Sequence, residues 1–378
     1  MLNNFDDYPI HQTAEPLAHP VSGDRNLYDR TWFNGYAEDG SCYFGIGMAI
    51  YPMRGVLDCA FSVVRPNGLQ HCFYGSRRAP LERTDMSCGP MRIEVVEPMR
   101  KMRVILDDND SGLRCDLTFS ARTAPIEEAH QTLWRGARRM MDATRFDQFG
   151  FWDGDITTPE GQVSVTGKKF RGTKDRFWGV RGVGEPETGG APEAPGSFFF
   201  LWAPLFWEDH VSHAIFFDGA KGEPLVREGI EAPLFAGPSD IPDDFLSAVE
   251  ASDTRMATAR HRVVYQPGTR LASGAEIDLE RVDGSNRTIT LEPILKFQMK
   301  GLGYMHPEWK QGAWQGELAT GHESFDPRQL DPLAPENLHV QQVVRASDGD
   351  KQGIGVLEQI CIGPYEPSGF ESYLDGSR

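Results

Sequence analysis

Turn signals interrupt this sequence about every ten residues, and this spacing constrains the fold more than any other feature. The segments between them are short and rich in β-branched and aromatic residues, as in Tyr43–Tyr51, Val56–Val64 and Phe198–Phe206. Gly, Pro, Asn and Asp supply the turns because they adopt the backbone angles of tight reversals. Residues 66–68, Pro-Asn-Gly, are expected to close a hairpin. The pattern predicts an all-β sandwich or barrel.

The same reasoning predicts strands through both halves of the chain, whereas helix is scarce. The composition of Ala124–Thr144 favours a helix, although Gly136 and the clustered arginines in this segment argue against one. Pro242–Ala251 is expected to form a short amphipathic helical segment. The further predicted strands are Leu69–Tyr74, Met91–Val96, Met102–Leu106, Leu113–Phe119, Gln162–Thr166, Val211–Phe217, Pro224–Arg227, Arg260–Tyr265, Glu276–Glu280, Arg287–Glu292, Leu295–Met299, Gln315–Leu318, His339–Arg345 and Gly355–Cys361.

The segment Val183–Ser197 divides the chain. It is rich in Gly, Pro and Glu and has no hydrophobic periodicity, so it cannot join a sheet. With 378 residues, the chain is long enough for two domains. We therefore expect an N-terminal domain at residues 1–187 and a C-terminal domain at residues 188–378. Both halves run in a similar order of strands, which indicates two similar β units.

Charge and composition exclude several classes of partner. The formal net charge is −17, and the acidic excess is spread along the chain, which argues against nucleic acid or an anionic membrane surface. No apolar run approaches the roughly 20 residues that span a bilayer, so membrane insertion is not expected. The first residues lack a basic start and an apolar segment, which predicts a cytoplasmic protein. The sequence leaves a homodimer open.

The centre of the sequence indicates a ligand site. The segment Lys174–Arg181 carries an acid, two guanidinium groups and an indole, and an aromatic strand follows at Phe198–Trp207. This combination is typical of a buried apolar pocket with few charges. Asp175 could be a general acid there, because a desolvated carboxyl favours its neutral form. The alternative is an ion pair with Arg176 or Arg181.

The order of these motifs resembles one known family. Asp175-x-x-Trp178, the aromatic strand Phe200–Trp207 and then His213–Gly219 are similar to the AttH-like and carotenoid 1,2-hydratase (hydroxyneurosporene synthase) superfamily. The resemblance implies an all-β fold with two lipocalin-like, calycin-type β-barrels side by side. It also implies an apolar polycyclic or isoprenoid ligand. Where the hydratases have an acidic residue within the aromatic strand, this chain has Ala203-Pro204, so the resemblance does not extend to carotenoid as the substrate. Asp175, Trp178 and the strand at Trp202 match the family.

A second cluster lies at residues 301–309. Histidine titrates near neutral pH and a buried tyrosine can still donate, so His306 with Tyr304 could move a proton to or from a ligand beside Trp309. The alternative is a loop histidine bonded to the backbone.

A third candidate is Glu358 in an apolar strand. Alternation puts Val356, Glu358 and Ile360 on one face, which favours the lumen of a barrel. By the same parity, His339 and Gln341 share a face of the preceding strand. The three polar residues could form one patch in the pocket.

No metal or cofactor is expected. The six cysteines contain no Cys-x-x-Cys pair, so neither a zinc knuckle nor a redox motif is present. Residues 107–118 begin like a calcium loop but end in Thr118, where a bidentate glutamate is needed. Alternation sends His210 and His213 to opposite faces of one strand. The arginines Arg135 to Arg145 are expected to pair with nearby carboxylates such as Glu128, or to hold an anionic group of a ligand.

Together these features predict a cofactor-independent hydratase, isomerase or cyclase. It would act by acid and base chemistry on an apolar terpenoid, steroid-like or polyketide substrate in a barrel pocket. Asp175 is the expected acid, with His306, Glu358 or Tyr304 assisting. The expected substrate-binding residues are Arg176, Trp178, Arg181, Trp202, Trp207, Trp309, His339 and Gln341. The alternatives are a lipocalin-like binding protein without catalysis, and a structural β protein whose own side chains fill its pocket.

Overall fold

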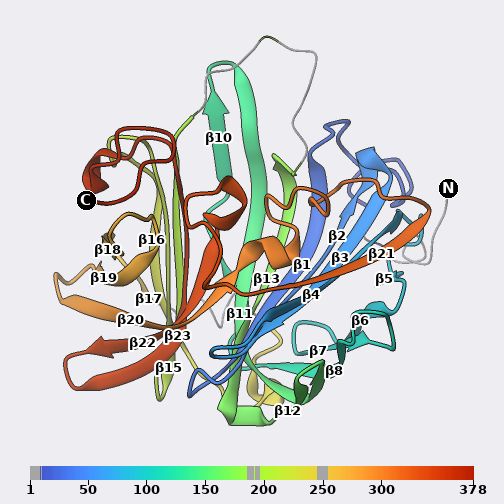
Figure 1. Ribbon diagram of the computed structural model, residues 1–378, viewed down its shortest axis with the longest axis horizontal. Coiled ribbons are helices and arrows are strands. Elements are labelled where there is room, and N and C mark those ends of the chain that lie inside the picture. The colour runs from blue at the N-terminus through green and yellow to red at the C-terminus, as the bar shows by residue number, and fades with distance from the viewer. Residues whose placement is uncertain (1–8, 10, 185–190, 192–195, 245–253) are drawn as a thin grey trace.

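The computed structural model describes residues 9, 11–184, 191, 196–244 and 254–378 (Figure 1). Within these residues the regular structure consists of β-strands and short 3-10 turns, arranged as two antiparallel sheets. Both sheets curl into nearly closed, barrel-like units, so the predicted all-β fold is confirmed. None of the described helical segments is long and apolar enough to cross a membrane.

The first sheet is built mainly from the N-terminal half of the chain. Its strands follow the order β21-β4-β3-β2-β1-β13-β11-β8-β7-β6-β5, and β9, β10 and β12 pair with the long β11. The bounds are β1 (Leu27–Ala37), β2 (Tyr43–Tyr51), β3 (Val56–Val64), β4 (Gln70–Arg78), β5 (Ser87–Cys88), β6 (Met91–Glu97), β7 (Lys101–Leu106), β8 (Arg114–Ala121), β9 (Ile126–Glu127), β10 (Gln131–Arg135), β11 (Arg138–Thr158), β12 (Gly161–Val165), β13 (Phe170–Arg181) and β21 (Leu318–Phe325).

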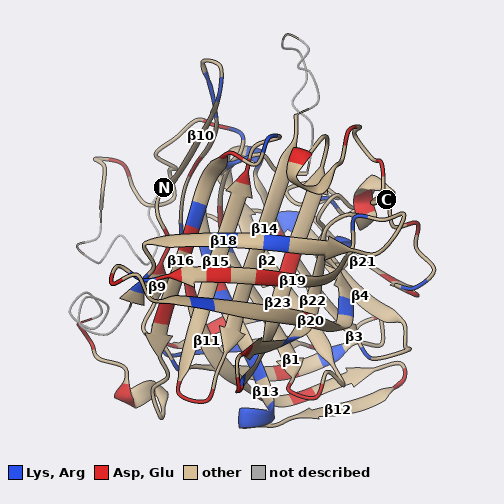
Figure 2. Cartoon of the chain, turned by 90° about the vertical axis from the view of Figure 1, so that its left-hand side faces the viewer, with Lys and Arg blue, Asp and Glu red and all other residues tan. Residues whose placement is uncertain are grey.

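The second sheet follows the order β17-β16-β15-β14-β23-β22-β20-β19-β18. Figure 2 shows how it curls, with β18, β19 and β20 crossing β14, β15 and β16. The bounds are β14 (Phe198–Phe206), β15 (His210–Asp218), β16 (Pro224–Pro233), β17 (Thr254–Arg255), β18 (Thr258–Tyr265), β19 (Ala272–Glu280), β20 (Asn286–Gln298), β22 (Val340–Asp348) and β23 (Lys351–Ile362).

One strand of the C-terminal half belongs to the first sheet. After β20, the chain leaves the second sheet through a 3-10 turn at Met299–Leu302, and β21 then pairs with the edge strand β4 (Figure 1). The segment from 299 to 317 therefore crosses between the sheets. The expected domain boundary between residues 187 and 188 lies outside the described residues.

Alternation along the strands creates three apolar layers. Phe33 and Trp152 lie in the core inside the first barrel, and Leu201 and Leu357 lie inside the second. The opposite faces of the same strands meet between the sheets, where Trp32, Trp202 and Phe206 pack in one cluster. Because neighbouring strand residues point to opposite faces, each central strand serves two cores. The layer between the sheets positions the candidate site.

Local structure follows the predictions in most segments and departs from them in three. The expected strands at residues 43–51, 56–64 and 198–206 match to the residue, and Asn67 takes φ 60° in the hairpin after β3. The helix expected at 124–144 is wrong, because this segment forms β9, β10 and the start of β11. The strands expected at 287–292 and 295–299 are one strand, β20, whose register shifts after Pro293, a residue without a backbone N–H. The strand expected at 315–318 begins only at residue 318.

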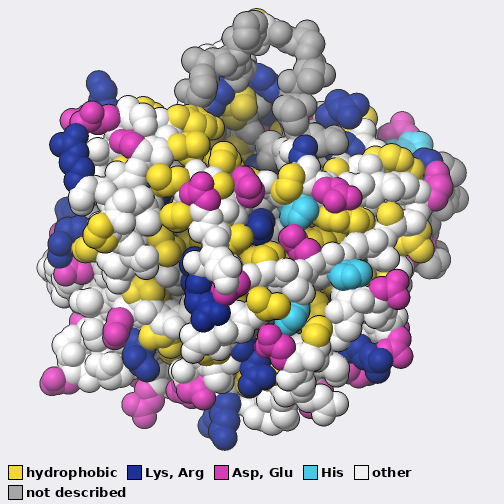
Figure 3. Space-filling model, viewed as in Figure 1, with side chains coloured by type: hydrophobic (Ala, Val, Ile, Leu, Met, Phe, Trp, Pro, Cys, Tyr) yellow, Lys and Arg dark blue, Asp and Glu magenta, His cyan; other side chains and the backbone are white. Residues whose placement is uncertain are grey.

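Charges of both signs are mixed on one face of the molecule. On the face shown in Figure 3, acidic and basic side chains lie interspersed. The segment expected at Pro242–Ala251 falls largely outside the described residues, which include only 242–244 of it.

Candidate functional site

A cluster of buried carboxyl groups lies between the two sheets. The neighbouring strands β11 and β13 supply Asp147 and Asp175, which are register partners, and the segment between β9 and β10 supplies Glu128. Strand β11 also supplies Arg145, and β15 of the second sheet supplies His213. We call these five residues the carboxyl cluster. They come together because Arg145, Asp147 and Asp175 stand on the strand faces that turn toward the second sheet.

The polar atoms of the carboxyl cluster lie 3.2 to 3.7 Å from one another. Arg145 Nη1 is 3.6 Å from Glu128 Oε2, and Arg145 Nε is 3.7 Å from Asp175 Oδ1. His213 Nε2 is 3.2 Å from Asp147 Oδ2 and 3.5 Å from Glu128 Oε1. The side chains of Glu128, Asp147 and His213 are 0% exposed, and that of Asp175 is 14% exposed.

Several of these buried atoms make no hydrogen bond within the described part of the chain. They are both carboxylate oxygens of Asp147, Oδ1 of Asp175, Oε1 of Glu128, both ring nitrogens of His213 and Nε of Arg145. Buried polar groups are almost always paired in folded proteins, because an unpaired one costs about 1–3 kcal/mol. So many in one place are more typical of a functional site than of a structural network.

Burial sets the protonation of the carboxyl cluster. Loss of solvent raises the pKa of Asp147 to about 8, and the neighbouring charge of Asp175 adds to this. Burial also raises the pKa of Glu128 well above its usual value and that of Asp175, although Arg145 opposes both shifts. Burial lowers the pKa of His213. At pH 7 the cluster therefore contains a neutral carboxylic acid beside a neutral imidazole.

A second polar group lies in the same layer, around Glu358 of β23. His339 Nε2 is 2.6 Å from Glu358 Oε1, and Gln341 Nε2 donates to the other oxygen. Gln341 Oε1 in turn accepts from the Tyr43 hydroxyl and from Asn34 Nδ2 of the first sheet. Burial alone would raise the pKa of Glu358, but these hydrogen bonds and the charge of His339 outweigh it and hold the pKa below its usual value.

Strand parity therefore predicted the patch of His339, Gln341 and Glu358, but not the side on which it lies. Glu358 was expected in a barrel lumen and instead faces the layer between the sheets. The lumen side of β23 is taken by Leu357 and Cys361, which belong to the core of the second barrel. The strand is apolar on both faces, so its sequence does not tell them apart.

Tyr304 and His306 point into different surroundings. Tyr304 accepts a hydrogen bond from Arg30, and its ring lies edge-on to that of His339 at 4.6 Å. His306 Nδ1 accepts from the backbone N–H groups of Glu308 and Trp309, at 3.0 and 2.7 Å. Tyr304 thus contacts the Glu358 group. His306 is held in its loop by the backbone at Nδ1, and its Nε2 lies 3.1 Å from Glu323 Oε1.

The predicted tryptophans are dispersed. Trp202 is buried between the sheets, with ring centroids 6.0 Å from Trp32 and 5.9 Å from His213. Trp178 stands on the face of β13 opposite to Asp175 and is 39% exposed. Trp207 packs inside the second barrel, and Trp309 stacks on a tyrosine of β4.

The two predicted arginines beside Asp175 also differ. Arg176 lies on the same face as Trp178 and pairs with Asp29 at 2.9 Å. Arg181 lies on the same face as Asp175, and its Nη2 donates to Gln311 Oε1 at 3.1 Å. Neither arginine forms an ion pair with Asp175 among the described residues; Arg145 is the arginine that approaches it.

Sequence reasoning missed Asp147 and Arg30. It gave Arg145 as an ion-pair partner of carboxylates such as Glu128 or as a holder of an anionic ligand group. The helix expected at 124–144 hid the start of β11. The signal that could have found this strand is the alternation of Arg145, Asp147 and Phe149 on one face.

Glu128, Asp147 and His213 could also hold a metal ion, since each offers a ligand atom within 4.8 Å of the others. Two carboxylates and an imidazole suit a divalent transition metal. Against this fit, the guanidinium of Arg145 already lies 3.6 Å from Glu128 and supplies positive charge there. The cluster does not require a metal to balance its charge.

Comparison with known proteins gives a family and a fold. The chain belongs to the family of unknown function DUF8625, which matches residues 2–371. A search of curated proteins found no match.

Three solved structures share the fold. Kievitone hydratase from Nectria haematococca has a TM-score of 0.51 at 11% identity, covering 91% of this chain and 94% of that one. A protein assigned as AttH from Nitrosomonas europaea has a TM-score of 0.55 at 11% identity, and the match covers 93% of this chain and 98% of that one. CghA, solved with Sch210972, has a TM-score of 0.50 at 13% identity, and the match covers 89% of this chain and 88% of that one. The resemblance to the AttH-like superfamily is confirmed for the fold.

Proposed function

We propose that this protein is a hydratase or cyclase that transfers a proton to an apolar small molecule held between its two sheets. The carboxyl cluster carries the proposal. It combines carboxyl groups of raised pKa, a neutral histidine and unpaired polar atoms in one buried layer. An acid that stays neutral at pH 7 can donate a proton to a weak base such as an alkene.

Hydration would use the carboxyl cluster twice. The neutral carboxyl of Asp147, or that of Asp175 when it holds a proton, gives the proton to one alkene carbon, and a cation forms on the other. Water attacks this cation and loses a proton to the resulting carboxylate, directly or through His213, so the enzyme returns to its first state. The rings of Trp202 and Trp32 can stabilise the cation. Arg145 stabilises the carboxylate between the two steps.

A cyclase or isomerase would use the same acid with a different second step. In a cyclase, an alkene carbon of the substrate attacks the cation in place of water, and the new cation then loses a proton to the enzyme carboxylate. In an isomerase, a neighbouring carbon loses a proton. Terpenoid, steroid-like and polyketide alkenes are the substrate classes that we propose.

Two of the similar structures agree with small-molecule chemistry. One carries the name hydratase, and another was solved with the small molecule Sch210972. At 11–13% identity they support the proposal through a shared fold, so the carboxyl cluster remains its main support.

The experiment is incubation with a panel of such alkenes in D₂O, followed by mass spectrometry. The parent protein should put solvent deuterium on carbon in one or more of them. Asp147→Asn or Asp175→Asn should reduce the rate by about 10²–10⁴-fold, the usual contribution of a general acid. Asp209→Asn is the matched control, because Asp209 is 86% exposed and pairs only with His210 among the described residues. Equal rates in the parent and in both cluster variants would contradict the proposal.

A second candidate is a binding protein without catalysis. It is favoured by the recess between the first sheet and segment 299–317, whose lining does not include the carboxyl cluster. Such a protein would bind panel members without isotope incorporation, and the cluster variants would bind as the parent does.

A further inference from the structure

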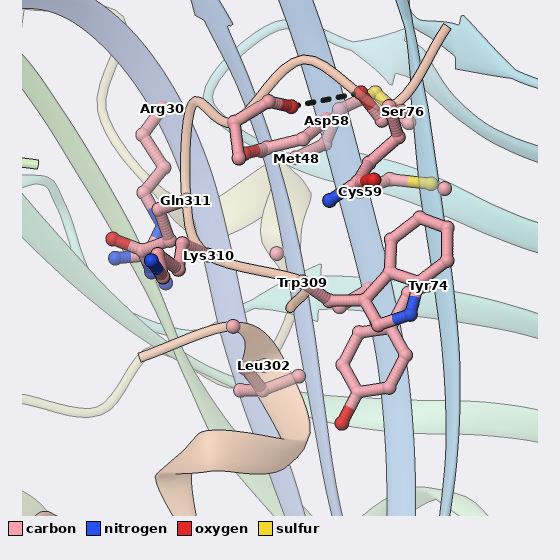
Figure 4. A pocket seen from close by; sticks show the side chains of 16 residues that line it. Arg30, Met48, Asp58, Cys59, Tyr74, Ser76, Leu302, Trp309, Lys310 and Gln311 are labelled. Carbon is pink, nitrogen blue, oxygen red and sulfur yellow. Dashed lines mark hydrogen bonds between the residues drawn. The ribbon is translucent and has the colours of Figure 1, made fainter. Parts of the chain in front are cut away.

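A recess lies on the face of the first sheet that turns toward the second. Its cavity volume is about 20 Å³, and it is covered by the segment from 299 to 317 (Figure 4). Tyr74 and Trp309 form an apolar side, and Arg30, Lys310 and Gln311 form a polar one. We call it the Arg30 recess.

Arg30 is a buried cation without a carboxylate partner. It is 3% exposed, Nη1 donates to the Tyr304 hydroxyl, and the guanidinium lies over the Tyr304 ring at 4.8 Å. Nη2 has no hydrogen-bond partner, and none of the described carboxylates forms a salt bridge with Arg30. Arg145, by contrast, has two carboxylates at 3.6 and 3.7 Å. A buried charge is costly unless it is paired. Arg30 lies near enough to Asp58 and Asp175 to lower the pKa of each, but it forms a salt bridge with neither, so its Nη2 remains free for an anionic group.

Two further cations lie beside Arg30. Arg181 also faces the Tyr304 ring, at 5.9 Å, and donates to Gln311 Oε1. Figure 4 shows Lys310 close to Arg30 and Gln311. Neither Arg181 nor Lys310 has a salt bridge to a described carboxylate either. In a chain of net charge −17, this side of the recess is therefore rich in positive charge.

The recess contains one acid, Asp58, on its other side. Asp58 accepts a hydrogen bond from the Gly312 backbone N–H at 2.6 Å, which ties the covering segment to β3. Burial raises the pKa of Asp58 to about 6. The Gly312 backbone, the charge of Arg30 and a hydrogen bond from Tyr51 oppose this shift, and Asp58 forms no salt bridge with Arg30.

Small residues leave the space open. Gly47 and Ala60 lie below Arg30 on the sheet, and a Cβ at position 47 would stand 3.5 Å from Arg30 Nη2. The unpartnered nitrogen therefore lies beside Gly47, which has no side chain, and near the ring of Trp32.

We propose that the Arg30 recess binds a carboxylate of the substrate, so that the substrate is an apolar molecule with an acidic group. This inference rests on the proposed function and adds the substrate class to it. The planar guanidinium suits a carboxylate, which can accept from both of its nitrogens. Arg30 lies near enough to Asp175 to lower the pKa of that carboxyl, so a carboxylate bound at Arg30 would lie near the carboxyl cluster.

The experiment compares two probes of the same shape, 2-naphthoate and 2-naphthamide, by isothermal titration calorimetry. The parent should bind naphthoate at least about tenfold more tightly than the neutral amide, in line with a charge-assisted hydrogen bond. Arg30→Met should abolish this preference and leave the affinity for the amide within about twofold. Absence of naphthoate binding, equal affinity for both probes, or a preference that survives Arg30→Met would overturn the proposal.

Two further variants keep the experiment decisive. Arg171→Met is the matched control, because Arg171 also faces the second sheet but has a carboxylate partner, Glu38, at 2.9 Å. It should retain the preference for naphthoate. Lys310→Met alters a partly exposed side chain and is expected to fold even if Arg30→Met does not. It should weaken naphthoate binding about threefold or more without changing amide binding, and unchanged naphthoate binding would count against the recess.

The outcomes separate this proposal from the proposed function. Naphthoate preference without turnover of any alkene would refute the catalytic proposal alone. Turnover that depends on Asp147, with no naphthoate preference, would refute the recess alone. Asp175→Asn should stop turnover and still bind naphthoate.

Discussion

Replacing Asp147 by Asn should change how the stability of the fold depends on pH. In the native state burial raises the pKa of Asp147 from 3.8 to about 8. A carboxyl that holds its proton more tightly when folded stabilises the fold at low pH, and this contribution is lost as the pH rises toward the native pKa. The loss is about 1.4 kcal/mol for each pH unit between the two pKa values. Between pH 5 and pH 7 the parent should therefore lose about 3 kcal/mol that the Asn variant does not lose.

The assay is urea unfolding of the parent and of Asp147→Asn at pH 5, 6 and 7. Lys174 acts in the opposite direction, because burial lowers its pKa to about 7 and its effect is to raise stability with pH above that value. Since Lys174 is present in both proteins, it cancels in their difference. Asp209→Asn, at an exposed carboxylate, should follow the parent. A difference between parent and Asp147→Asn that stays constant from pH 5 to 7 would refute the reasoning.

Three further predictions concern other parts of the structure. Gly172→Ala should destabilise the fold by about 3 kcal/mol or prevent folding, because the new methyl would stand 2.2 Å from a backbone oxygen of β1; an unchanged urea midpoint would contradict this. Glu358→Gln should remove a loss of stability between pH 5 and pH 3, because the hydrogen bond from His339 helps to hold the native pKa of Glu358 below its usual value and is lost on protonation; parallel pH profiles of parent and variant would count against it. Treatment with EDTA should leave the melting temperature unchanged, because Arg145 supplies the positive charge beside Glu128; bound zinc or manganese in metal analysis would show otherwise.

Much of the fold could be predicted from local patterns. Strands β2, β3 and β14 have bounds that match the prediction to the residue, since each is an apolar run closed by turn residues. Alternation along each strand also predicted that His339, Gln341 and Glu358 could form one patch, because alternation depends on the strand alone. The family resemblance supplied the pairing of two barrels.

What remained hidden depends on contacts between distant segments. The pair of Arg30 and Tyr304 is separated by 274 positions, and nothing in the sequence near either residue indicates the other. The central strands are apolar on both faces, so their pattern could not say whether Glu358 faces a lumen or the second sheet. Strand β11 carries charged and aromatic residues together with an arginine-rich start, and its composition alone favoured a helix. Residues 141–151 of β11 pair with β13, and this pairing makes the segment a strand.

The protonation of Asp147 tests the account most directly. Difference infrared spectroscopy of the parent against Asp147→Asn can follow this one carboxyl between pH 4 and pH 9. The account predicts a neutral acid at pH 7 and a titration midpoint near 8. A carboxylate that is already ionised at pH 7, with a midpoint near 4, would contradict a proton donor between the two sheets.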